Sequence, residues 1–315
     1  MSRNTHLALL PEALYSKSQV YIRRGLRAKN AGELEEYQLW ASLALELLAK
    51  SSLSCVHPAL VADPQHPESL FAACGRTLSP NVKTITAKTL FERLGHISKE
   101  FDKRLQKFCE QIALRRNSEI HSGESPFSGM QADAWEKHFW YAVQVVLALQ
   151  DKVLDEWLGA ESSTDPKQLL IDAENAMHMA VQTRIENAKE DFEVQHRNKN
   201  KRDELIESSK YIRCWEHNDK FNICPDGYEL NACPACNAMG ILGGILWGEE
   251  VSDKFDPEDS FAEYVEKTFS VEEFFCITCG LHLAGKREMG VTELPEEFHE
   301  IEERELEFEP DYGND

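Results

Sequence analysis

The chain has 315 residues, of which 55 are Asp or Glu and 34 are Lys or Arg, giving a net charge of −21. This length allows two or three domains with sizeable cores. Hydrophobic residues make up 42% of the chain, and no apolar run approaches the roughly 20 residues that a membrane-spanning helix needs. The nine Cys are an odd number with no disulfide pattern, which is typical of a reducing compartment. We therefore expect a folded cytoplasmic protein that does not enter a membrane.

Helical periodicity dominates the first 160 residues. The first expected helix covers 14–29 and the second runs from about Leu34 to Ser51-Ser52. A short helix is expected over 68–74. The third long helix should start near Ala87 or His96 and end at Arg116, and the fourth should cover 132–158. Four long helices with few strand signals predict an antiparallel bundle.

A further helix is expected from Asp165-Pro166 onward. Its apolar residues recur every three or four positions from Leu170 to Phe192. Such a stripe serves either for packing back on the bundle or for dimerisation, and the pattern does not decide between them. Beyond Cys214 short alternating runs predict strands, two of them around 240–247, with an inserted helix over 258–269.

The negative charge is concentrated in the C-terminal third. From Cys214 to the end there are 26 Asp or Glu against 6 Lys or Arg. Residues 291–315 alone hold 11 acidic residues and one basic residue. Such a block predicts a solvated, disordered tail, and the acidic part as a whole is a candidate docking site for a protein partner.

Two Cys-x-x-Cys pairs predict a zinc site in this acidic part. Its ligands would be Cys233, Cys236, Cys276 and Cys279. Two residues between thiolates let both sulfurs reach one tetrahedral Zn²⁺ at about 2.3 Å. Asn237 and Gly280 follow the two pairs and tolerate the positive φ of a tight turn. The arrangement resembles a zinc ribbon whose closed four-Cys site is structural.

Three further candidate ligands lie near this site in the sequence, namely Cys214, His217 and Cys224. Cys214 and His217 have ligand spacing, so a second metal site or an exchange of ligands is one interpretation. These residues do not complete a closed shell by themselves, and buried Cys residues without a metal are the alternative.

The string from Arg116 to His121 combines a permanent cation with a titratable imidazole at a helix end. RNA carries its own nucleophile, the 2′-OH, so its cleavage needs only proton transfer and charge stabilisation. His121 can donate or accept a proton near neutral pH, and Arg116 can hold two phosphate oxygens. Asn117 is expected to support them, and a basic preceding helix fits RNA guidance. The alternative is an ordinary surface helix end.

The segment Leu114–Gly123 resembles the catalytic motif of HEPN-domain ribonucleases, in which Arg, often followed by Asn, and His are separated by four to six residues. The resemblance implies a HEPN-like fold, catalytic Arg116 and His121 with Asn117 in support, and a homodimer whose two motifs line one cleft. It further implies a role in toxin–antitoxin systems or anti-phage defence. Gly123 stands where one variant of the family has Tyr, which argues against regulation by nucleotide transfer.

We therefore expect a mainly α protein. Its parts are a HEPN-like antiparallel helical bundle over 1–162, a long amphipathic linker or dimerisation helix over 163–213, a small β zinc ribbon over 214–290 and an acidic tail over 291–315. The expected function is metal-independent endoribonuclease activity at a dimeric site. The alternative is a non-catalytic RNA- or protein-binding module whose acidic part docks a partner. Glu46 and Lys50 lie one turn apart on the second helix and could reach the Arg116–His121 site, but an ordinary surface pair is the expected interpretation.

Overall fold

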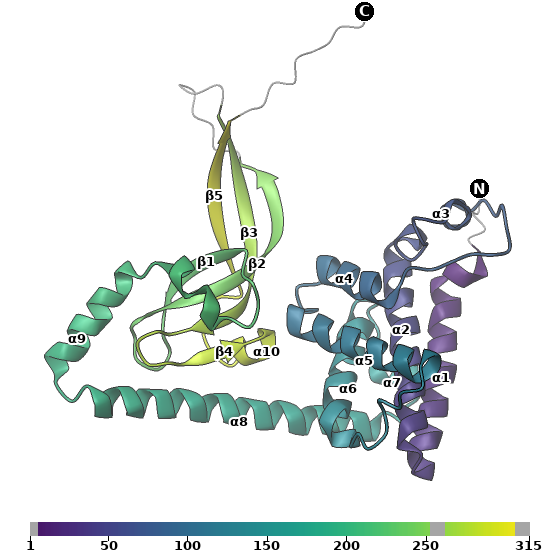
Figure 1. The fold of residues 1–315 in the computed structure, drawn as a ribbon, viewed down its shortest axis with the longest axis horizontal. Helices are drawn as coiled ribbons and strands as arrows, with labels where there is room; N and C mark the ends of the chain where they lie inside the picture. The colour runs from purple at the N-terminus through teal and green to yellow at the C-terminus, as the bar shows by residue number, and fades with distance from the viewer. Residues whose placement is uncertain (1–5, 253–261, 306–315) are drawn as a thin grey trace, which may run out of the picture. The chain divides into compact units, whose positions relative to one another are not determined.

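The structure is a computed structural model that describes residues 6–252 and 262–305. The described chain is mostly helical, with one antiparallel sheet in its C-terminal part (Figure 1). It divides into two compact units, Met1–Ala176 and Met177–Asp315. We call these the helical unit and the sheet unit.

The helical unit is built around its second helix. Its helices are η1 (Leu7–Leu9), α1 (Pro11–Ala31), α2 (Leu34–Val56), η2 (Pro58–Leu60), α3 (Pro67–Ala73), α4 (Ala87–Ile97), α5 (Lys103–His121), α6 (Ala132–Ala148), α7 (Leu154–Leu158) and the first part of α8 (Thr164–Gln195). Gly32, at φ 81°, ends α1, and α2 then returns alongside it (Figure 1). Helices α4, α5 and α6 also contact α2.

Among the described helices, α2 is long and apolar enough to cross a membrane, but its apolar window is 61% buried inside the protein. Leu45, Leu48 and Leu53 on this helix are almost completely buried. Its apolar composition therefore reflects its position in the core of the bundle.

The expected third and fourth helices are each interrupted. The third is divided into α4 and α5, and Gly95 lies within α4. Asp102 restarts the helix, because its carboxylate accepts the Leu105 N–H at 2.7 Å and so satisfies a free helix donor. Between α6 and α7 the chain turns at Asp151, whose φ is 54°. The single helices expected over these segments are therefore wrong at these breaks.

A buried carboxylate ties α6 to the α1–α2 pair. Glu136 is 3% exposed; it accepts the Tyr37 hydroxyl at 2.6 Å and the Trp140 indole N–H at 3.4 Å, and it forms an ion pair with Lys29. Burial, together with the Glu136 charge, raises the pKa of Tyr37. These contacts satisfy an acid that would otherwise be costly to bury.

The sheet unit contains five antiparallel strands in the order β1-β2-β3-β4, with β5 beside β3. The strands are β1 (Gly227–Ala232), β2 (Met239–Val251), β3 (Ala262–Phe275), β4 (His282–Ala284) and β5 (Glu297–Glu305), and the helical segments are α9 (Lys199–Ser208), η3 (Ser209–Tyr211), η4 (Cys214–Lys220) and α10 (Lys286–Met289). In Figure 1, β2, β3 and β5 form a long narrow arm.

Much of the apolar stripe of α8 packs in the core of the sheet unit. Val181 and Phe192 are buried in one cluster with Phe269 and Phe274 of the sheet. Leu170, at the start of the stripe, packs instead against the core of the helical unit. Packing within the chain therefore uses much of the stripe that was also a candidate for dimerisation.

Three expectations for the sheet unit are wrong. Residues 262–269, expected to be helical, belong to β3, and 258–261 lie outside the described residues. Part of the expected disordered tail, 297–305, is β5, and 306–315 lie outside the described residues. Phe298 of β5 stacks on Phe269 at 4.9 Å, and Lys267 forms an ion pair with Glu302 at 2.7 Å. These contacts stabilise an acidic strand that has little hydrophobicity of its own. The two strands expected around 240–247 are the single strand β2.

Candidate functional site

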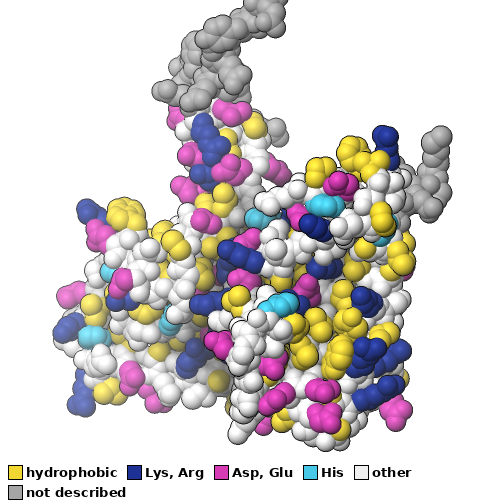
Figure 2. Space-filling view, turned by 45° about the vertical axis from the view of Figure 1, so that its right-hand side comes forward, with side chains coloured by type: hydrophobic (Ala, Val, Ile, Leu, Met, Phe, Trp, Pro, Cys, Tyr) yellow, Lys and Arg dark blue, Asp and Glu magenta, His cyan; other side chains and the backbone are white. Residues whose placement is uncertain are grey.

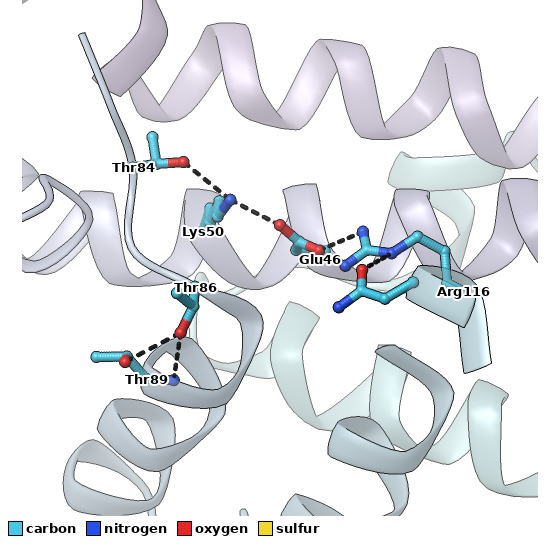
Figure 3. A network of polar contacts seen from close by, with 7 residues as sticks. Glu46, Lys50, Thr84, Thr86, Thr89 and Arg116 are labelled. Atoms are coloured by element: carbon cyan, nitrogen blue, oxygen red, sulfur yellow. Dashed lines mark hydrogen bonds and ion pairs between the residues drawn. The ribbon is translucent and has the colours of Figure 1, made fainter. Parts of the chain in front are cut away.

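Arg116 lies on the buried side of α5 and faces α2 (Figure 3). Its Nη1 donates to Glu46 Oε2 at 2.5 Å, and its Nε donates to Asn117 Oδ1 at 3.0 Å. On the other side of the carboxylate, Lys50 Nζ donates to Glu46 Oε1 at 2.7 Å and to Thr84 Oγ1 at 3.0 Å. Two cations therefore share one carboxylate, and the network carries one net positive charge.

This network is well shielded from water. The side chains of Lys50, Arg116 and Glu46 are 9%, 10% and 15% exposed. Burial alone would raise the pKa of Glu46, but the charges and hydrogen bonds of Lys50 and Arg116 outweigh it and lower that pKa. The expectation that Glu46 and Lys50 form an ordinary surface pair is therefore wrong.

The local sequence explains why these groups meet. Glu46 and Lys50 are four residues apart on α2, so they lie on one face of the helix. Thr84 is held by an isolated bridge between its strand-like segment and Ala62. Charged residues within the apolar part of α2 hint that they are buried, but nothing in that helix alone identifies Arg116 as the partner of Glu46. Thr84 lies in the Pro-rich segment before α4 and gave no such signal.

His121 is the last residue of α5 and is exposed. It follows Arg116 by five residues, which places it about 140° around the helix and about 7.5 Å along it. Within the described part of the chain the imidazole forms no hydrogen bond or ion pair. The structure brings Arg116 and Asn117 together and leaves His121 on a different face of the same helix.

The surface around His121 is partly apolar and partly basic. Leu114 and Ile120 are 65% and 48% exposed, but they lie about 9 Å apart along α5 and on different sides of it, so each is a single exposed apolar residue. Lys103, Arg104 and Lys107 are exposed nearer the start of α5. Arg115 is half-buried, with Nη1 3.1 Å from the Met130 sulfur.

The four Cys of the two Cys-x-x-Cys pairs gather at one point of the sheet unit. Their Sγ atoms all lie within 4.8 Å of one another. The Cys233–Cys279 and Cys236–Cys276 sulfur pairs are each 3.6 Å apart. A tetrahedral site with bonds of about 2.3 Å separates its sulfurs by about 3.8 Å. The cluster therefore fits one tetrahedral metal ion with four thiolate ligands.

The two Cys-x-x-Cys turns have the same backbone geometry. In each turn the N–H of the first Cys donates to the carbonyl five residues later, and its carbonyl accepts the N–H four residues later. These bonds are Cys233 to Ala238 at 2.8 Å, Asn237 to Cys233 at 3.0 Å, Cys276 to Leu281 at 2.8 Å and Gly280 to Cys276 at 2.8 Å. Asn237 and Gly280 have φ of 61° and 76°, as the sequence predicts for these positions.

The four thiols interact strongly with one another. Hydrogen bonds within the cluster lower the pKa of Cys276, while the pKa values of Cys233, Cys236 and Cys279 are raised. In the described part of the chain, Cys214, His217 and Cys224 do not form a cluster of three ligands. Cys224 is exposed and Cys214 is half-buried, so the geometry gives no support to a second metal site.

Comparisons with known proteins found no relative: no protein-family model, no curated protein and no solved structure matches the chain. Function is therefore inferred from the residues of the chain itself.

Proposed function

We propose that the helical unit is a metal-independent endoribonuclease of the HEPN type, in which Arg116 and His121 are catalytic and Asn117 supports Arg116. One observation carries this proposal. Arg116 is fixed in a buried network with a net positive charge, five residues before an exposed imidazole on the same helix. Its Nη2 nitrogen forms no hydrogen bond to a described residue, which leaves a donor for a phosphate oxygen.

The reaction is an attack of the RNA 2′-OH on the adjacent phosphorus. The bond from phosphorus to O5′ breaks, and the products are a 2′,3′-cyclic phosphate and a 5′-OH. One imidazole takes the 2′-OH proton, and a second donates a proton to the leaving O5′. Arg116 stabilises the charge that develops on the non-bridging oxygens.

Because one chain supplies a single motif imidazole, we propose a homodimer in which two copies of α5 contribute to one cleft. Ile120, next to His121 and 48% exposed, offers apolar surface for such an association. The four-Cys cluster is proposed to hold a structural Zn²⁺, since a closed four-thiolate shell leaves no open position for a substrate. A cytoplasmic location is proposed from the cysteine usage, and a role as a toxin or defence effector follows from the resemblance alone.

The alternative is a non-catalytic module that binds RNA or a protein. It is favoured by the structural engagement of Arg116 and by the orientation of His121 away from it. In that case the acidic sheet unit docks a basic partner.

Cleavage assays with matched histidine variants distinguish these two functions. Wild-type protein, His121→Ala and His96→Ala are incubated with a 5′-labelled RNA in EDTA, and cyclic-phosphate ends are measured. His96 is the control because it is also an exposed His in the last turn of a helix. We expect the wild type and His96→Ala to cleave equally, and His121→Ala to cleave at least about 100-fold more slowly. Equal cleavage by all three proteins refutes the catalytic assignment, and no cleavage by any of them favours the binding module.

A further inference from the structure

Helix α1 carries a group of cations without carboxylate partners. Lys17, Arg23, Arg24 and Arg27 are exposed, and none of them forms an ion pair with a carboxylate in the described part of the chain. The whole chain has 55 acidic residues against 34 basic ones, so carboxylates are plentiful. We call these four residues, together with the neighbouring rings of Tyr21 and Trp40, the α1 face.

The four cations are arranged on one side of the helix. From Lys17 to Arg27 they extend over about 15 Å and lie within about 120° of the helix circumference. Arg23 and Arg27 are four residues apart and Arg24 and Arg27 are three apart, so their like charges repel along the helix. This repulsion is weak, and a bound anion would relieve it. Figure 2 shows Lys and Arg side chains gathered beside hydrophobic ones at the lower right, over α1.

Two aromatic rings are interleaved with these cations. Tyr21 and Trp40 lie with ring centroids 5.3 Å apart. The Arg24 guanidinium lies 5.0 Å from the Trp40 ring and 5.7 Å from the Tyr21 ring, and Lys17 Nζ lies 5.7 Å from Tyr21. These cation–π contacts hold Arg24 in place while its exposed side chain keeps N–H donors in solvent.

The close packing of α1 on α2 positions Trp40 at this surface. A Cβ at Gly25 would lie 3.3 Å from Trp40 Cβ and 3.3 Å from the Tyr37 ring. The lack of a side chain at Gly25 lets α2 approach α1 closely enough for the rings of Tyr21 and Trp40, whose planes are tilted by 57°, to lie side by side. We call these two rings the Tyr21–Trp40 platform, and the Arg24 guanidinium lies near both of them.

The neighbouring acidic groups do not neutralise this face. Glu12 lies in the first turn of α1, about 16 Å along the helix from Arg23. Glu33, Glu35 and Glu36, at the start of α2, line a separate hollow of about 590 Å³ together with residues of the 127–131 loop. In the described residues none of these carboxylates lies within ion-pair distance of the α1 cations.

We propose that the α1 face binds the phosphate backbone of single-stranded RNA and holds bases against the Tyr21–Trp40 platform. The proposal rests on the proposed function, because it assigns that ribonuclease a surface that holds its substrate away from the reacting bond. Arginine forks suit phosphate oxygens, and aromatic rings stack bases without sequence preference. An anionic membrane surface is the competing partner for cations, but the aromatic platform favours a nucleic acid.

Binding is measured with a ligand that cannot be cleaved, so that it is independent of catalysis. The probe is a fluorescein-labelled 20-nucleotide 2′-O-methyl oligouridine, whose blocked 2′ oxygen cannot act as a nucleophile. The test variant is Arg23→Gln/Arg24→Gln/Arg27→Gln. The control is Lys88→Gln/Lys210→Gln/Lys220→Gln, which removes the same charge from cations that already have exposed carboxylate partners.

Fluorescence anisotropy from 50 to 300 mM salt gives both affinity and salt dependence. Each phosphate contact with a single strand contributes about 0.7 to the slope of log K against log salt, or roughly fivefold in affinity at 0.1 M salt. We expect the test variant to bind about 100-fold more weakly, with a slope smaller by about 2. The control is expected to stay within threefold of the wild type.

Several outcomes overturn the proposal. The first is that the test variant binds with the same affinity and the same salt slope as the wild type. The second is that the control variant loses as much affinity as the test variant. The third is that the wild type binds phosphatidylserine vesicles but not the oligouridine. Circular dichroism of each variant shows whether α1 remains folded. If the wild type binds the oligouridine as expected but never cleaves ordinary RNA, the ribonuclease proposal is refuted and the proposed RNA binding by the α1 face is supported. If the wild type cleaves RNA but the three Arg→Gln substitutions do not change binding, the ribonuclease proposal is supported and RNA binding by the α1 face is refuted.

Discussion

Replacing Glu46 with Gln should destabilise the helical unit strongly. The substitution keeps the shape of the side chain but leaves Lys50 and Arg116 buried without a counter-charge, and their side chains are only 9% and 10% exposed. Removing one partner from a buried ion pair costs about 3–5 kcal/mol. In a domain of this size each kcal/mol lowers the melting temperature by roughly 2–4 °C. The expected fall, taken from the lower bound of about 3 kcal/mol, is therefore roughly 6–12 °C.

The same substitution should change the pH dependence of stability. The pKa of Glu46 is lowered in the folded protein from its ordinary value of 4.5. A lowered pKa means that the carboxylate stabilises the fold fully above pH 4.5, and this stabilisation is lost as the pH falls through the folded pKa. The Glu46→Gln variant has no such loss. The gap in stability between wild type and variant should therefore narrow in acid.

Differential scanning calorimetry at pH 7 and at pH 4 measures both effects. Glu35→Gln is the control, because Glu35 is an exposed acid in the first turn of the same helix; its melting temperature should stay close to that of the wild type. A Glu46→Gln variant that melts within 2 °C of the wild type at pH 7 would show that the buried cations need no carboxylate.

Two further predictions concern the sheet unit. Cys276→Ser should abolish stoichiometric metal binding and lower the thermal stability of the sheet unit, and elemental analysis that still finds one metal ion per chain in this variant would contradict the four-thiolate site. Gly240→Ala should cost about 1–3 kcal/mol by denaturant unfolding, because its Cβ would lie 2.3 Å from the Phe274 ring. Gly248→Ala, where a Cβ meets nothing within 4 Å, is its control, and equal stability of the two variants would refute the packing argument.

The sequence predicts which segments of the bundle are helical, because their apolar faces have a single period, but it misses the breaks before Asp102 and at Asp151. The prediction of secondary structure fails where the spacing of the apolar residues suits both a helix and a strand. Val265 and Phe269 are four residues apart, as on a helix, but on β3 they share one face with Lys267 between them. The ion pair of Lys267 with Glu302 joins β3 to β5, a strand far along the chain, so the local pattern could not reveal it.

The two candidate sites also differ in how far the local sequence predicts them. The gathering of the four Cys at one point is confirmed, and so is the backbone of each Cys-x-x-Cys turn, because that turn is a local structure in which Asn237 and Gly280 supply the positive φ. Arg116 and Asn117 are adjacent in the sequence and bonded in the structure. The buried role of Glu46 depends on how α2 packs against α5, which no single helix pattern contains.

The matching geometry of the two Cys-x-x-Cys turns affects how the long β2–β3 hairpin tolerates insertions and deletions. A metal ion bound there closes a loop between two rigid turns, so the ends of the hairpin are fixed whatever its length. The entropy of loop closure grows only by about 0.6 kcal/mol per doubling of length. Insertions or deletions between the two strands should thus leave metal affinity almost unchanged, and the hairpin is free to vary in length while its base stays constant.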